Sequence, residues 1–247
     1  MSSNTAIEWT DATWNPVTGC TKVSPGCAHC YAEAITLRFK RGGPFLPGLT
    51  TIKLHPERLD LPLSWREPRR IFVNSMSDLF HEEIPLPFIR SIFSVMEQAD
   101  QHIFQVLTKR HERLARIACK LPWPDNVWVG VSVENQVWAE QRVPCLKQVP
   151  ARVRFLSCEP LLRPLNLEPH LDGIHWVIVG GESGAKARPI HPNWVRDIRS
   201  QCYEAGVPFF FKQWGGTTCK AGGRLLDGRF WGEMPETKPS LLVAQRQ

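Results

Sequence analysis

Three closely spaced cysteines constrain this chain more than any other feature of its sequence. Cys20, Cys27 and Cys30 fall within eleven residues, in a segment that also carries Pro25-Gly26. Two residues separate Cys27 from Cys30, and Pro25-Gly26 allows the chain to turn back, so all three thiols can point at one centre. We call residues 19–33 the cysteine loop. Its pattern predicts a metal site with three thiolates and no obvious fourth ligand.

Four interpretations of the cysteine loop follow from the residues. Unconnected buried thiols would not explain the clustering. Structural zinc needs a fourth ligand, which His29 could supply, although the sequence has no second Cys-x-x-Cys pair. A redox Cys-x-x-Cys would leave Cys20 unexplained. A [4Fe–4S] cluster with three protein ligands would keep one iron open to a small molecule that receives an electron.

The rest of the composition narrows the class of protein. The chain has 247 residues, 43% of them hydrophobic, and no apolar run near the ~20 residues that span a bilayer, so we expect no membrane association. Its first residues lack the pattern of an export signal, which predicts a cytoplasmic protein with reduced thiols. The five other cysteines are scattered singly, unlike a disulfide framework. The net charge of +6 is compatible with a nucleic-acid partner.

Hydrophobic patterning predicts strands that alternate with helices. This alternation is typical of an α/β protein, and about six units favour a partial or complete TIM-like barrel of parallel strands with outer helices. A doubly wound sheet is the alternative. We expect one domain over residues 1–235 and a flexible tail over 236–247. The predicted strands are 51–54, 71–76, 103–108, 127–132, 153–157, 176–180 and 208–211, and the predicted helices are 30–40, 88–99, 110–118, 136–146 and 193–204.

Polar residues follow each predicted strand. Glu134, Glu159 and Glu182 each come one or two residues after a hydrophobic run, so in a barrel they would converge on one mouth. Gly180-Gly181 removes side chains where a ligand or backbone could approach closely. Three cations also follow strands and could hold a carboxylate, nucleotide phosphates or a nucleic-acid backbone: Lys109, Arg110 and Lys212.

Several short motifs together resemble a known family. They are residues 8–10, 13–16, 19–20, 26–32, 74–80, 107–110, 132–136, 157–161 and 180–184. The combination, which spans about residues 7–231, resembles the phage-associated three-cysteine-motif family of uncharacterised proteins. That family looks like a relative of the radical S-adenosylmethionine enzymes, which use a partial TIM barrel. The resemblance therefore implies the same fold and an enzymatic activity.

The resemblance also implies a role for each element. Cys20, Cys27 and Cys30 would ligate three irons of a [4Fe–4S] cluster, and S-adenosylmethionine would chelate the fourth. Reductive cleavage would yield a 5′-deoxyadenosyl radical that abstracts hydrogen from a substrate. The implied cofactor contacts are Asn74, Ser75 and Asp78 for the methionine part, Ser132 and Glu134 for the ribose, Glu182 for the adenosine or the substrate, and Glu159, Gly180 and Gly181 around them.

Three features depart from the superfamily pattern. Six residues rather than three separate Cys20 from Cys27, and His29 occupies a position that the superfamily usually gives to an aromatic residue. The Gly-Gly-Glu run at 180–182 follows a late strand instead of an early one. We expect a flavodoxin- or ferredoxin-like reductant, a nucleic acid or nucleotide as substrate, and room for a protein partner. The alternatives are a zinc-stabilised, non-catalytic nucleic-acid-binding protein and an iron–sulfur sensor.

Overall fold

A parallel sheet of seven strands forms the centre of the molecule. The computed structural model describes residues 5, 7–34, 51–218 and 221–236. The neighbouring strands of the sheet are, in order, β1 (Ala12–Trp14), β4 (Arg70–Val73), β5 (Ile103–Thr108), β6 (Val127–Ser132), β7 (Val153–Cys158), β8 (Trp176–Gly180) and β9 (Phe209–Gln213). A separate antiparallel pair joins β2 (Val17–Thr18) to β3 (Lys53–Leu54).

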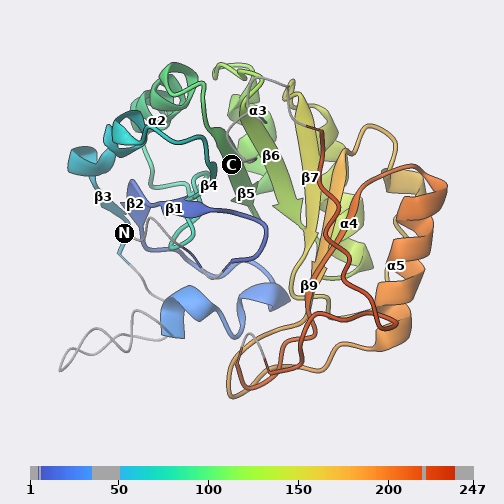
Figure 1. Ribbon diagram of the computed structural model, residues 1–247. Helices are drawn as coiled ribbons and strands as arrows, with labels where there is room; N and C mark the ends of the chain where they lie inside the picture. Colours follow the sequence, from blue (N-terminus) through green and yellow to red (C-terminus); the bar gives the residue numbers. More distant parts are fainter. Residues whose placement is uncertain (1–4, 6, 35–50, 219–220, 237–247) are drawn as a thin grey trace.

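The strand order identifies the architecture as a partial TIM-like barrel. Each strand pairs with the strand that precedes it in the parallel sheet, and the order never reverses. A doubly wound sheet would need such a reversal, so that alternative is wrong. β1 and β9 lie at the two ends of the sheet, and the sheet curls with helices on its outside (Figure 1). The predicted α/β fold is confirmed in its partial form.

The helices lie close to the predicted ranges. They are α2 (Leu86–Gln98), α3 (His111–Ala118), α4 (Gln136–Lys147) and α5 (Pro192–Glu204), with the short 3₁₀ turns η1 (Pro25–Cys27), η2 (Pro56–Arg58), η3 (Leu61–Ser64) and η4 (Glu168–His170). Of the helix predicted over 30–40, residues 31–34 are helical, Cys30 is not, and residues 35–40 lie outside the described residues, as does most of the predicted tail. Within the described parts of the chain, no helix is long and apolar enough to cross a membrane.

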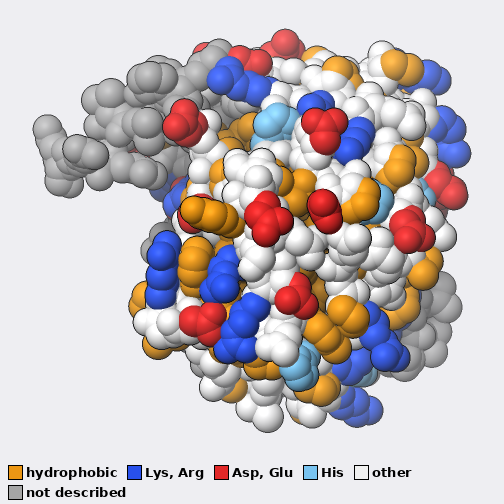
Figure 2. Space-filling view, turned by 90° about the vertical axis from the view of Figure 1, so that its right-hand side faces the viewer, with side chains coloured by type: hydrophobic (Ala, Val, Ile, Leu, Met, Phe, Trp, Pro, Cys, Tyr) orange, Lys and Arg blue, Asp and Glu red, His pale blue; other side chains and the backbone are white. Residues whose placement is uncertain are grey.

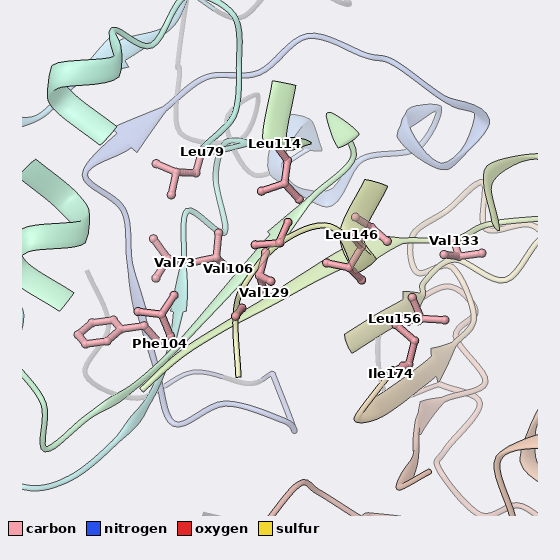
Figure 3. Close-up of a cluster of buried hydrophobic side chains, with 14 of the residues drawn as sticks. Val73, Leu79, Phe104, Val106, Leu114, Val129, Val133, Leu146, Leu156 and Ile174 are labelled. Atoms are coloured by element: carbon pink, nitrogen blue, oxygen red, sulfur yellow. The ribbon is translucent and has the colours of Figure 1, made fainter. Parts of the chain in front are cut away.

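Two separate hydrophobic clusters cover the two faces of the sheet. The outer cluster packs strand residues such as Val106 and Val129 against helix residues such as Leu114 and Leu146 (Figure 3). The inner cluster is aromatic and contains Trp9, Phe72, Trp128, Phe155, Trp176, Ile178 and Phe210. The Trp9 ring lies 4.8 Å from the Phe72 ring and 6.3 Å from the Trp176 ring, between centroids. This cluster fills the barrel interior at the level of the strands.

Candidate functional site

The carboxyl ends of the strands bring the predicted polar residues to one mouth. Side chains alternate along a strand, so residues two positions beyond the inner aromatic cluster face the same interior. This register places Ser157 and Glu159 beyond Phe155, and Gly180 beyond Ile178. Two contacts between strand ends support the placement. Between the neighbouring strands β5 and β6, Lys109 Nζ donates to Ser132 Oγ at 3.0 Å. Across β8, Lys212 Nζ of β9 lies 3.3 Å from Oε1 of Glu159, which follows β7.

The cysteine loop lies at this same end of the sheet, where the blue N-terminal segment passes below the arrowheads in Figure 1. Its first attachment is to Glu134, which follows β6. Ser24 Oγ donates to Glu134 Oε1 at 2.5 Å. A Cβ on Gly26 would collide with that same oxygen, so only glycine lets the loop approach this closely. Arg142 Nη1 donates to Glu134 Oε2 at 2.8 Å, and both side chains are fully buried.

The second attachment is to Glu182, which follows β8. Arg188 donates to this carboxylate through Nη2 at 2.6 Å to Oε1 and through Nε and its backbone N–H at 2.9 Å to Oε2. His29 Nδ1 lies 2.9 Å from Oε2, and Arg188 Nη2 also donates to the Pro25 carbonyl at 2.9 Å. Burial raises the pKa of Glu182, but the hydrogen bonds from Arg188 and His29 outweigh it and lower the pKa to about 2.

Further attachments reach β4 and β5. Arg110 Nη2 donates to Thr21 Oγ1 at 2.6 Å and to the Thr21 carbonyl at 3.1 Å. Tyr31 donates its hydroxyl proton to the Ser75 carbonyl. The backbone N–H of Gly19 donates to the Met76 carbonyl at 3.1 Å. The loop is therefore tied to the ends of four strands: β4, β5, β6 and β8.

The three cysteines of the loop are partly buried thiols. Burial raises the pKa of Cys20 to about 12, with a further rise from the Asp78 and Cys27 charges and an opposing effect of Arg110. Burial likewise raises the pKa of Tyr31, and the Cys30, Glu159 and Cys20 charges add to it. Among the described residues, no three His, Cys, Asp or Glu side chains are gathered as a ligand set. The donor chemistry nevertheless fits an iron–sulfur cluster, because one loop carries three soft thiols of the kind that bind such clusters.

The residues predicted for the methionine part lie at the end of β4. Asp78 is engaged within the protein, because it accepts from Thr108 Oγ1 at 2.7 Å and from the backbone of Phe80 and Lys109. Ser75 exchanges a hydrogen bond with the Asn15 side chain. Asn74 has a left-handed backbone (φ 59°) and accepts from the Val17 N–H, while its buried Nδ2 has no hydrogen-bond partner among the described residues. Asn74 thus retains a free donor.

Glu159 occupies the middle of the mouth, between Glu134 and Glu182. Its Oε1 is buried and, although Lys212 Nζ is 3.3 Å away, makes no hydrogen bond in the described chain. A Cβ on Gly180 would lie 2.5 Å from this oxygen, which explains the glycine. A glycine is needed at position 181 for a different reason: a Cβ there would collide with the Trp214 carbonyl in the loop after β9. The group that approaches Gly181 closely is thus the backbone of that loop.

The predicted substrate-binding cations all have partners within the chain. Lys109 contacts Ser132, Arg110 contacts Thr21 and Lys212 contacts Glu159. On the face that Figure 2 shows, Lys and Arg side chains are interspersed with Asp and Glu. On this face, the charges therefore add no support for a nucleic-acid surface beyond the net charge.

Sequence reasoning did not single out the two arginines that bind Glu134 and Glu182. Arg142 carried a signal, because it falls on the buried stripe of α4 with Ala139, Val143 and Leu146. A charged residue on such a stripe needs a buried partner. Arg188 lies in a loop without periodicity, so its partner could not be inferred.

Comparisons with known proteins show a similar fold. The chain is similar to the solved structure of a cysteine-to-serine mutant of spore photoproduct lyase, with a TM-score of 0.52 and 12% sequence identity. The match covers 83% of this chain and 64% of that one. A tyrosine-to-phenylalanine mutant of spore photoproduct lyase matches with a TM-score of 0.44, 11% identity, and coverage of 81% and 60%. This chain thus spans less than two thirds of the length of those proteins. No curated protein matches the chain.

The fold therefore defines the class: a partial α/β barrel similar to that of spore photoproduct lyase. Residues 4–235 match the family described as "Protein of unknown function (DUF5131)". The chain belongs to that family, which is consistent with its resemblance to an uncharacterised family.

Proposed function

We propose that this protein is a radical S-adenosylmethionine-like enzyme in which Cys20, Cys27 and Cys30 hold a [4Fe–4S] cluster. The observation that carries the proposal is the position of the cysteine loop, tied across the carboxyl-terminal mouth of a partial barrel. In barrels of this type the active site lies at that end of the strands. Three thiolates leave one iron for S-adenosylmethionine, as the resemblance implies.

The chain's own residues would bind and orient the cofactor. When bound, the cluster supplies an electron to S-adenosylmethionine. Asn74 Nδ2 is a buried donor suited to the methionine carboxylate, and Glu159 Oε1 is a buried acceptor suited to an amino or hydroxyl group. Ser75 and Ser132 border these positions. The loop covers the mouth and so keeps water from the reacting groups.

The substrate class that we propose is a nucleic acid or nucleotide. The net charge of +6 supports it. Lys109, Arg110 and Lys212 lie at the mouth and would have to exchange their present partners for phosphate. We expect a flavodoxin- or ferredoxin-like protein as the reductant.

Anaerobic reconstitution with iron and sulfide tests the proposal. The wild type should become brown, bind about four irons per chain, and cleave S-adenosylmethionine after reduction with dithionite. Cys27→Ala should lose the colour, whereas Cys119→Ala, which removes an exposed cysteine far along the chain, should keep it. A colourless protein with stoichiometric zinc would contradict the enzyme. A stable cluster without cofactor cleavage would favour an iron–sulfur sensor.

A further inference from the structure

The Glu182 carboxylate has an unusually complete set of hydrogen bonds. It receives three donors from Arg188 and faces His29 Nδ1, all between 2.6 and 2.9 Å. A carboxylate offers about four lone-pair sites, so these contacts occupy its capacity. Its side chain is 5% exposed. A ligand at the mouth would have to displace one of these donors before it could bind Glu182.

Arg188 joins this carboxylate to the cysteine loop. The same Nη2 that binds Glu182 Oε1 also donates to the Pro25 carbonyl at 2.9 Å. Pro25 begins η1, which contains Cys27, while His29 directly precedes Cys30. The guanidinium and the imidazole therefore grip the loop on both sides of Cys27. Charge-assisted hydrogen bonds of this kind are stronger and more directional than neutral ones.

We propose that Arg188, Glu182 and His29 form a latch that holds the cysteine loop in position over the mouth, and that they act as positioning residues rather than as cofactor or metal ligands. The role in holding a cluster rests on the proposed function. The grip on the loop does not, because every contact that makes it lies within the protein chain. The latch also accounts for His29 without assigning it to zinc.

The latch lies apart from the main hydrophobic core. The Arg188 and His29 side chains are each 32% exposed, and η1 contains no buried residue. Losing Arg188 should therefore loosen the loop while the barrel stays folded. Arg196 on α5 offers a matched control, because it is a partly exposed arginine that binds a carboxylate, Asp227, away from the loop.

Alkylation of the cluster-free protein tests the latch directly. Rates at Cys27 and Cys30 are measured by peptide mass spectrometry relative to exposed Cys119, with buried Cys158 and Cys202 reporting an intact fold. We expect Arg188→Ala to raise the Cys27/Cys119 and Cys30/Cys119 rate ratios by about 10-fold or more, corresponding to the loss of at least one charged hydrogen bond. Arg196→Ala should leave both ratios unchanged. Arg188→Lys, which keeps the charge but not the forked geometry, should fall between.

A second measurement uses the reconstituted protein. If the proposed function holds, Arg188→Ala should lose iron to a ferrous chelator several-fold faster than Arg196→Ala at equal starting iron content. Unchanged alkylation ratios in Arg188→Ala would overturn the latch, whether or not a cluster forms. A wild type that takes up no cluster would overturn the proposed function but leave the alkylation result decisive. If alkylation of Cys158 and Cys202 shows that Arg188→Ala is unfolded, the test rests on Arg188→Lys alone. Cys27/Cys119 and Cys30/Cys119 ratios in Arg188→Lys that equal those of the wild type would then contradict the latch.

Discussion

Replacing Glu134 by alanine should destabilise the protein strongly. Arg142 is 0% exposed, and its guanidinium lies 2.8 Å from Glu134 Oε2, 2.8 Å from the Ser132 carbonyl and 4.0 Å from the centroid of the Trp138 ring. Burial lowers the pKa of Arg142, and the Glu134 charge opposes that change. Without the carboxylate, a buried charge would stay uncompensated, which typically costs about 3–5 kcal/mol.

That loss is large compared with the about 5–15 kcal/mol by which domains are stable. For a chain of this size, each kcal/mol shifts the melting temperature by about 2–4 °C, so the expected decrease is roughly 6–20 °C. Urea unfolding of the cluster-free protein, followed by circular dichroism, measures the free energy of unfolding. Glu140→Ala on the exposed side of α4 is the control and should change it by less than about 0.5 kcal/mol.

A double variant separates loss of charge balance from loss of packing. Glu134→Leu with Arg142→Met replaces the pair by apolar side chains, and such replacements are often neutral or stabilising. The double variant should therefore unfold at a higher urea concentration than Glu134→Ala. Two results would contradict a buried charge pair at this position. One is a loss of less than about 1 kcal/mol in the free energy of unfolding of Glu134→Ala. The other is a double variant that is less stable than Glu134→Ala.

Two further predictions concern packing and pH. Gly130→Ala should lower the free energy of unfolding by roughly 1–3 kcal/mol, because the new Cβ would lie 2.5 Å from the Phe155 ring. Gly232→Ala is the control, since its Cβ would have its nearest neighbour at 3.9 Å, and it should change the stability little. Equal urea midpoints for the two variants would contradict this packing. Acid should weaken the fold through Glu182, whose folded pKa of about 2 lies below the ordinary 4.5. This stabilisation is fully present above 4.5 and is lost as pH falls toward 2. Stability measured across that window should fall less steeply in Glu182→Gln, and an equally steep fall would sink the assignment.

The sequence allowed the fold to be predicted because periodicity reports burial. The strand predicted over 103–108 agrees with β5 to the residue, and 127–132 agrees with β6. In both strands one face packs against the helices and the other against the barrel interior, so most of their side chains are apolar. The early strand β1 was harder to recognise. It has three residues and gains its stability from pairing with β4, which is distant in sequence.

The mouth was predictable as a location but not as a set of contacts. The alternation of side chains alone is enough to place polar residues at the ends of strands. Lys109, Ser132, Glu159 and Lys212 lie at such ends. Which carboxylate binds which cation depends on loop geometry, which has no sequence period. Arg188 reaches back to Glu182 across a loop that also carries Gly184 in the left-handed region. Such a contact cannot be deduced from spacing.

Glu134, Glu159 and Glu182 differ in the cation that each contacts. Glu134 and Glu182 each bind an arginine, eight and six residues further along the chain. Both also contact the cysteine loop, Glu134 through Ser24 and Glu182 through His29. Glu159 instead faces Lys212 from β9, and lysine acts as a point charge without a fork that could occupy both oxygens. The two flanking carboxylates are thus committed to holding the loop, while the central one keeps a buried oxygen without a hydrogen bond in the described chain. Because an unmet buried acceptor is costly, a ligand that donates to Glu159 Oε1 would gain a hydrogen bond that the chain does not supply, as would one that accepts from Asn74 Nδ2.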